Sequence, residues 1–260
     1  MQVNQNPGKY IMLEGEEGAG KTTQLSLLED RMRKSGIDAV SVKEPSRANL
    51  FGRLAYAIYS YESEHDAVRR ELSACLGAPE FSLAKSSVGA MGGRHIARFE
   101  SIAADFLKGG DSELPFLLQL AMILARRELL RTTVLPKLQS GTHVLSDRGF
   151  FSTLAYGASE GLDWEELLAL HRELLGDLFV MPNLAIILDI DPREGLLRTL
   201  GKQGGQTDHF DSEDLQAKIR QCYLELADDK RFSPFTRVLS GAGTSAEVHE
   251  AVWGEVSAVL

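Results

Sequence analysis

Residues 15–22 read GEEGAGKT, and this stretch constrains the fold of the chain more than any other. Its spacing, G-x-x-x-x-G-K-T, is typical of a loop that wraps around phosphate groups, and it lies between an apolar run at residues 10–13 and a helix-like run at residues 22–34. Glycines let such a loop close around an anion without Cβ clashes, so that backbone N–H groups point at phosphate oxygens. Strand, loop and helix in this order predict an α/β fold with a phosphate site at the loop, rather than an ordinary glycine-rich turn.

The residue types inside the loop indicate which part of a nucleotide each would contact. Lys21 brings a mobile positive charge for the β and γ phosphates, and the hydroxyl of Thr22 is placed to bind Mg²⁺. The residues predicted to hold the nucleotide are Gly15, Gly18, Ala19, Gly20, Lys21, Thr22 and Thr23.

Composition argues against several other classes of protein. The chain has 260 residues, of which 43% are hydrophobic, as expected for one α/β domain with or without an insertion. Its net charge of -9 disfavours a protein that binds nucleic acid polymers, which would carry a basic face. Residues 1–9 are polar, and no apolar run approaches the ~18 residues of a membrane span, so we expect neither secretion nor membrane insertion.

Cys75 and Cys222 are far apart in the sequence, and neither belongs to a C-x-x-C or Cys/His metal motif. Isolated cysteines of this kind are usually reduced thiols of the core. We therefore expect a cytoplasmic protein.

Polar side chains follow two further predicted strands. Glu44 follows a strand expected at residues 38–42, and Asp147 and Arg148 follow a strand expected at residues 143–146. The carboxyl ends of parallel strands meet at one edge of a sheet, so we expect these side chains to face the phosphate site. There Asp147 is a candidate for binding Mg²⁺, and Arg148 can clamp a phosphate. A solvated turn carboxylate is the alternative for Glu44.

Arg126 interrupts a long apolar helix that is expected at residues 116–138. A buried guanidinium must be paired or must face a cleft, because burying it without a partner is prohibitively unfavourable. Arg126 is therefore either a ligand contact or an arginine at the helix rim that pairs with a surface carboxylate.

The stretch from residue 60 to residue 110 has a mixed pattern. Helices are expected at residues 61–76 and 94–107, and the Ser/Gly/Ala-rich run at residues 82–93 between them is predicted to be a mobile connector. The charged first helix of this stretch is predicted to be a solvated face over a small satellite core, with an altered ligand pocket or a partner surface as the alternative.

Residues 198–211 have the composition of a closing lid. Arg198 and Lys202 lie four residues apart, hence on one helical face, and glycines follow them. An ordinary solvated loop is the alternative. The remaining elements are predicted as strands at residues 184–188 and 237–239, helices at 163–175 and 212–229, and a capping box at 244–247 that opens the last helix.

Beyond the loop, motifs in a fixed order resemble the thymidylate kinase family, a group of P-loop nucleoside monophosphate kinases. They are GEEGAGKTTQ at residues 15–24, KEP at 43–45, the helix at 117–126, LP at 135–136, VLSDR at 144–148, STLAY at 152–156, the stretch 188–208 and YLELA at 223–227. The resemblance implies an α/β fold of three layers, in which a central parallel sheet is flanked by helices. It also implies a single P-loop kinase domain over residues 1–260, a helical insertion at residues 60–110 and a homodimer.

The resemblance further implies a reaction, in which the γ-phosphoryl group of ATP is transferred, with Mg²⁺, to a nucleoside monophosphate. The family substrate is dTMP. Because the acceptor phosphate is already an anion, alignment and charge neutralisation would supply most of the catalysis. The residues expected to carry it are Lys21, Arg148, Arg198 and Lys202.

On the family pattern, Glu17 approaches the 3′ side of the acceptor sugar and Tyr156 lines the deoxyribose pocket. Arg126 approaches the thymine edge, and Arg148 the acceptor phosphate. The full set expected to bind the acceptor is Glu17, Glu44, Arg47, Arg126, Arg148 and Tyr156.

The chain departs from the family pattern at several positions. Residues that replace the usual ones are Met122 for the base-stacking aromatic, Gly149 for the aromatic after Asp-Arg, Gly157 for a glutamine, His209 for the lid arginine, and Ser46-Arg47-Ala48 for Gly-Gly-Thr. Without the lid arginine, Arg198 and Lys202 would have to supply the positive charge of the lid, to which His209 could add only when protonated.

Two other functions are compatible with these motifs. In a deoxynucleoside kinase, Glu44 would act as general base on a 5′-hydroxyl group. A nucleotide-binding regulatory protein of the same fold would bind ATP with little turnover. A GTPase is disfavoured, because no Asn-Lys-x-Asp sequence occurs in the chain.

Overall fold

The structure, a computed structural model, describes residues 2–260 apart from 60–64, 111–112, 204–209 and 211. Its central sheet has five parallel strands in the order β3-β4-β2-β6-β7. These strands are β2 (Tyr10–Glu14), β3 (Ala39–Lys43), β4 (His143–Asp147), β6 (Leu184–Asp189) and β7 (Thr236–Ser240). Two short strands, β1 (Gln2–Val3) and β5 (Val180–Met181), pair separately. The predicted parallel sheet is confirmed.

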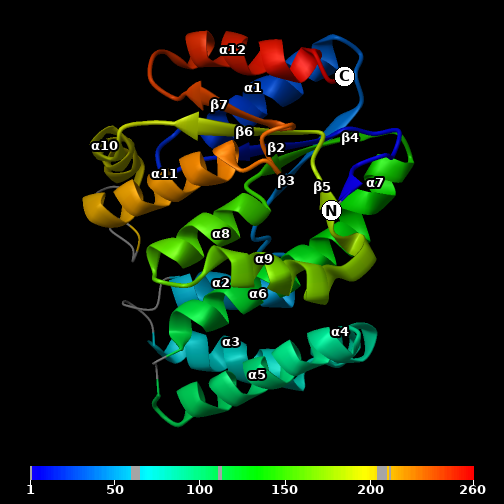
Figure 1. The fold of residues 1–260 in the computed structure, drawn as a ribbon, viewed down its shortest axis with the longest axis vertical. Helices are drawn as coiled ribbons and strands as arrows, with labels where there is room; N and C mark the ends of the chain where they lie inside the picture. The colour runs from blue at the N-terminus through cyan, green and yellow to red at the C-terminus, as the bar shows by residue number, and fades with distance from the viewer. Residues whose placement is uncertain (1, 60–64, 111–112, 204–209, 211) are drawn as a thin grey trace.

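Helices cover both faces of the sheet, because successive residues of a strand point to opposite sides. One layer consists of α1 (Lys21–Lys34) and α12 (Ser245–Ser257). The other contains α6 (Leu114–Leu129), α8 (Phe150–Ser159), α9 (Trp164–Leu175) and α11 (Glu213–Asp228). In β2, Ile11 and Leu13 belong to the core under α1 and α12, whereas Tyr10 and Met12 belong to the core of the second layer. Figure 1 shows the sheet between these layers, which confirms the predicted three-layer fold.

Four helices extend the second layer away from the sheet (Figure 1). They are α2 (Leu50–Tyr59), α3 (His65–Gly77), α4 (Pro79–Ser87) and α5 (Ala90–Leu107). The mobile connector predicted at residues 82–93 is therefore wrong, since almost all of that run is helical. Phe81, which is 3% exposed, anchors α4, because its ring packs 5.4 Å from that of Phe99 and 6.3 Å from that of Phe51.

Glycine within α5 explains why the sequence pattern was misleading there. Gly92 lies inside the helix, where a Cβ atom would come within 2.8 Å of the Glu173 carbonyl oxygen on α9. The glycine permits close approach of two helices instead of marking a loop.

The remaining elements connect these layers. The predicted helix at residues 116–138 is divided into α6, a π-helical turn (Leu130–Val134) and α7 (Leu135–Gln139), which contains Pro136. A short 3-10 turn (Gly176–Leu178) follows α9, and α10 (Pro192–Gln203) follows β6. The capping box that opens α12 is confirmed. Among the described residues, no helix is long and apolar enough to cross a membrane.

Candidate active site

The phosphate-wrapping loop connects β2 to α1, and its glycines adopt backbone angles that favour glycine. Gly15, Gly18 and Gly20 have φ values of 132°, 73° and 94°. A Cβ atom at Gly18 would lie 2.0 Å from the Gly195 carbonyl oxygen of α10, whereas one at Gly20 would meet nothing within 4 Å. The loop is therefore tightly packed on its α10 side and open at the start of α1.

This difference predicts unequal effects of two substitutions. Gly18→Ala should lower the free energy of unfolding by about 3 kcal/mol or more, because backbone atoms on both sides resist displacement. Gly20→Ala should cost only about 1 kcal/mol of backbone strain. Urea unfolding measures both, and equal losses would contradict the packing described for the loop.

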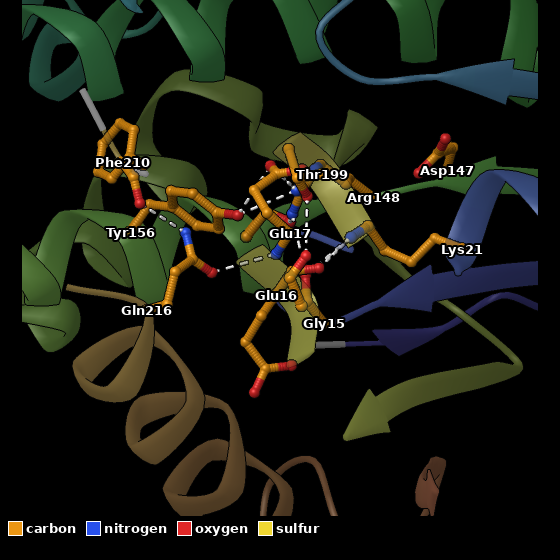
Figure 2. Close-up of polar contacts among 12 residues, drawn as sticks. Gly15, Glu16, Glu17, Lys21, Asp147, Arg148, Tyr156, Thr199, Phe210 and Gln216 are labelled. Atoms are coloured by element: carbon orange, nitrogen blue, oxygen red, sulfur yellow. Dashed lines mark hydrogen bonds and ion pairs between the residues drawn. The ribbon is translucent and has the colours of Figure 1, made fainter. Parts of the chain in front are cut away.

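Lys21 begins α1 with its ammonium group folded back onto the loop. Nζ donates hydrogen bonds to the carbonyl oxygens of Gly15, at 3.0 Å, and Glu16, at 2.6 Å (Figure 2). Burial, with the positive charge of Arg148 nearby, lowers the pKa of Lys21 to about 8, although Glu17 and Asp147 act to raise it. A lysine cation within a glycine-rich loop of this kind suits a polyphosphate group.

The lowered pKa of Lys21 predicts how activity depends on pH. The lysine is a cation below about pH 8 and becomes neutral above it, so kcat/KM for ATP should be constant below this pH and fall about tenfold per pH unit above it. Initial rates across this range, with activity recovered on return to neutral pH, measure the effect. A flat profile to about pH 10 would show that the charge of Lys21 is not required.

Thr22 and Asp147 join α1 to the end of β4. The Thr22 hydroxyl donates to Asp147 Oδ2 at 2.7 Å, and Asp147 is 2% exposed. Over the described ranges, no group of three or more His, Cys, Asp or Glu side chains is arranged to hold a metal ion. A hydroxyl and a carboxylate fit Mg²⁺ that takes its other ligands from phosphate oxygens and water.

Arg148, Glu17 and Tyr156 meet beside the loop, as Figure 2 shows. Arg148 has a φ of 73°, which is unusual for a residue with a side chain. Its guanidinium contacts the Glu17 carboxylate, and donates to the Gly15 carbonyl at 3.1 Å and to the Tyr156 hydroxyl at 2.9 Å. The Tyr156 hydroxyl in turn donates to Glu17 at 3.1 Å. Strained backbone of this kind is often found at functional sites.

Electrostatics fix the charge of Glu17. Burial acts to raise the pKa of its carboxyl, but Arg148 and Lys21 outweigh it and lower the pKa to about 2. Glu17 is therefore an anion at neutral pH, and it forms an ion pair with Arg148.

Arg126 lies further along the same edge of the sheet, paired with Glu44. Both side chains are 4% exposed, and Arg126 Nε donates to Glu44 Oε2 at 2.5 Å. The alternatives of a rim arginine and of a solvated turn carboxylate are therefore wrong. Arg126 also donates to the Thr153 hydroxyl at 3.0 Å, to His171 Nε2 at 2.6 Å and to the Gly149 carbonyl at 2.7 Å. Of its five N–H groups, the described contacts leave one, on Nη2, available for a ligand.

The structure describes only some of the residues predicted to form a lid. Arg198 on α10 donates to the Gly241 carbonyl at 3.0 Å and pairs with Glu194 at 2.5 Å, so it lies against the loop region. Lys202 is on α10, but its side chain lies outside the described part of the chain, as do residues 204–209 and 211, which include His209. Arg47 stacks on the ring of Tyr56, with Cζ 4.0 Å from the ring centroid, and has no described contact with the cluster around Arg148.

Sequence reasoning missed a buried cluster behind Arg148. Glu14 Oε2 accepts hydrogen bonds from Ser152, at 2.5 Å, and from Tyr223, at 3.2 Å, and Ser152 also accepts one from Arg148 at 3.3 Å. Burial raises the pKa of Glu14. The sequence did single out Tyr223, because it opens the YLELA motif at residues 223–227. It did not single out His171 on α9, which contacts Arg126 and belongs to no motif.

A phosphate-wrapping loop after a central parallel strand, with a lysine, a threonine and a strand-end aspartate beside it, defines the chain as a nucleotide-binding protein of the P-loop class. The family model for thymidylate kinase matches residues 13–77 and 102–237, which is more than half of the chain. The chain therefore belongs to the thymidylate kinase family, whose members are ATP-dependent phosphotransferases. The unmatched residues 78–101 contain α4 and the first part of α5.

Relatives from both bacteria and archaea are similar over nearly the whole chain. A thymidylate kinase of Bradyrhizobium sp. (strain ORS 278) is 31% identical over 254 residues, which cover 96% of this chain and 89% of the relative. A probable thymidylate kinase of Thermococcus onnurineus (strain NA1) is 31% identical over 243 residues, 94% of each chain. A thymidylate kinase of Deinococcus radiodurans is 31% identical over 255 residues, 96% of this chain and 97% of the relative.

Proposed function

We propose that this protein transfers the γ-phosphoryl group of ATP to dTMP and forms dTDP. The observation that carries the proposal is the juxtaposition of two cationic sites, Lys21 in the loop and Arg148 beside it, in a chain of the thymidylate kinase family. Their separate surroundings suit two phosphorylated substrates, a donor at the loop and an acceptor at Arg148.

On the donor side, the N–H groups of Gly15, Gly18, Ala19, Gly20, Lys21, Thr22 and Thr23 would hold the phosphates of ATP. Thr22 and Asp147 would hold Mg²⁺, which neutralises charge on the phosphates when it is bound. Lys21 and Arg198, with Lys202, would stabilise the charge that moves during transfer.

On the acceptor side, the Arg148 guanidinium would release the Glu17 carboxylate and bind the phosphate of dTMP in its place, since both groups are anions. Glu17 and Tyr156 would then be free to contact the sugar. Arg126, locked by Glu44 and with one N–H group left, would donate to a carbonyl oxygen of the base. Glu44 and Arg47 would complete this side, with Glu44 acting through Arg126.

A deoxynucleoside kinase would need a general base, and the geometry of Glu44 argues against that role. Its Oε2 atom is held by Arg126 at 2.5 Å, and its Oε1 atom is also buried, so neither oxygen is open to the 5′-hydroxyl group of a nucleoside. A phosphorylated acceptor requires no such base.

A coupled assay with a panel of acceptors tests the proposal. The protein should phosphorylate dTMP, and thymidine should give no product. Activity on thymidine alone would favour the deoxynucleoside kinase, whereas ATP binding with no turnover of any common monophosphate would favour a regulatory protein.

Two further features belong to the same proposal. A homodimer is expected from the family resemblance, and a cytoplasmic location is supported by Cys75 and Cys222, which are buried free thiols. Size-exclusion chromatography with light scattering tests the first.

A further inference from the structure

Gln216 on α11 joins the loop residue Glu17 to the chain at Phe210. Its side chain is only 1% exposed. Oε1 accepts a hydrogen bond from the Glu17 N–H at 3.1 Å, and Nε2 donates one to the Phe210 carbonyl at 2.9 Å (Figure 2). A buried amide with partners at both ends holds those partners at a fixed separation, because breaking either bond leaves a buried polar group unpaired.

The two partners of Gln216 meet again through Tyr156. The Phe210 ring is fully buried and packs edge-on against the Tyr156 ring, with centroids 4.9 Å apart. The Tyr156 hydroxyl donates to the Glu17 carboxylate at 3.1 Å. These contacts therefore form a closed ring, which leads from the Glu17 N–H through Gln216, Phe210 and Tyr156 back to the Glu17 carboxylate.

The direction of the Glu17 N–H group assigns this residue to one side of the loop. Phosphate-wrapping loops direct N–H groups at their anion. The N–H of Glu17 points instead at Gln216, and its carboxylate points at Arg148 and Tyr156. Glu17 is thereby withdrawn from the phosphate cradle and presented to the neighbouring site.

We propose that Gln216 is a positioning residue for the acceptor nucleotide. By holding Glu17 and Phe210 together, it sets the spacing between Glu17, Arg148 and Tyr156, which are the acceptor-binding groups under the proposed function on which this inference rests. The described hydrogen bonds of Gln216 reach neither Lys21 nor Asp147. Acceptor affinity should therefore depend on Gln216, and ATP affinity should not.

Gln216→Leu tests this separation, because leucine has a similar size and lacks both polar groups. Calorimetric titration of the full chain should show dTMP bound about tenfold more weakly or worse, with ATP affinity unchanged within about twofold. Gln221→Leu is the matched control, since Gln221 is an exposed glutamine of the same helix that bonds only to Glu225 among the described residues. It should bind both nucleotides as the wild type does.

Gln216→Glu supplies a readout that a loss of packing would not move. The introduced carboxylate can accept from Glu17 but cannot donate to the Phe210 carbonyl until it is protonated, and burial raises the pKa of such a group. Relative to wild type at each pH, dTMP affinity of Gln216→Glu should therefore recover as pH falls from about 8 to about 6. Gln216→Leu should show no recovery.

The outcomes separate this inference from the proposed function. If the wild type binds dTMP and Gln216→Leu binds it equally well, the positioning role is wrong. The role is also wrong if both nucleotides lose affinity to the same extent, or if Gln216→Glu shows no recovery at low pH. A wild-type protein that binds ATP but not dTMP would overturn the proposed function itself, and the inference with it.

Discussion

Replacing Lys21 with methionine should lower kcat by about 10³-fold or more while the protein stays folded. The Lys21 side chain is buried, and its ammonium group is held by two loop carbonyls at 3.0 and 2.6 Å. During phosphoryl transfer, negative charge shifts between the nucleotides, and a cation that leaves these carbonyls can follow it. Methionine fills the same space but has no charge. Steady-state kinetics at saturating ATP and dTMP measure the loss.

Lys34→Met is the matched control for this experiment. Lys34 is exposed in the last turn of the same helix, so its loss should change kcat by no more than about twofold. Urea unfolding of both variants separates a chemical effect from a loss of structure. If Lys21→Met is folded and its kcat stays within about tenfold of wild type, the role of the loop in catalysis is wrong.

Arg148→Met should lower kcat/KM for dTMP by about 10³-fold, with KM for ATP nearly unchanged. The guanidinium contacts Gly15, Glu17 and Tyr156, which lie at the proposed acceptor site, and the Arg148 backbone has a φ of 73°. Arg148→Lys should recover only part of the loss, because an ammonium group cannot bind a phosphate through two parallel N–H groups.

The matched control is Arg33→Met, which removes an arginine with a side chain that is 76% exposed and far from these contacts. Both nucleotides should be used normally by this variant. Equal losses for ATP and dTMP in Arg148→Met would contradict the assignment of Arg148 to the acceptor, and full activity of Arg148→Lys would contradict bidentate binding.

Much of the sheet and its polar edge could be predicted from the sequence, because both follow from local patterns. The spacing of glycines around Lys21 defines the loop, and strands read as short apolar runs. Since the carboxyl ends of parallel strands share one edge, Glu44 and Asp147 were expected there. The register confirms this, with Lys43 and Leu13 both opposite Asp147.

The parts that could not be predicted depend on contacts between distant segments. Nothing near His171 in the sequence indicates that α9 brings it 2.6 Å from Arg126 on α6. Glu14 and Tyr223 are likewise joined only by the folded structure. In α5, Gly92 was misleading because helix-to-helix packing, not the backbone preference of glycine, determines its place. Local patterns carry no information about such partners.

The identity of the labelled product formed from γ-labelled ATP and dTMP tests the central claim most directly. The proposed function predicts dTDP with the label in its β-phosphate, formed by the wild type and lost in Lys21→Met and Arg148→Met. Label in dTMP formed from thymidine, or no labelled nucleotide with any monophosphate acceptor, would contradict it.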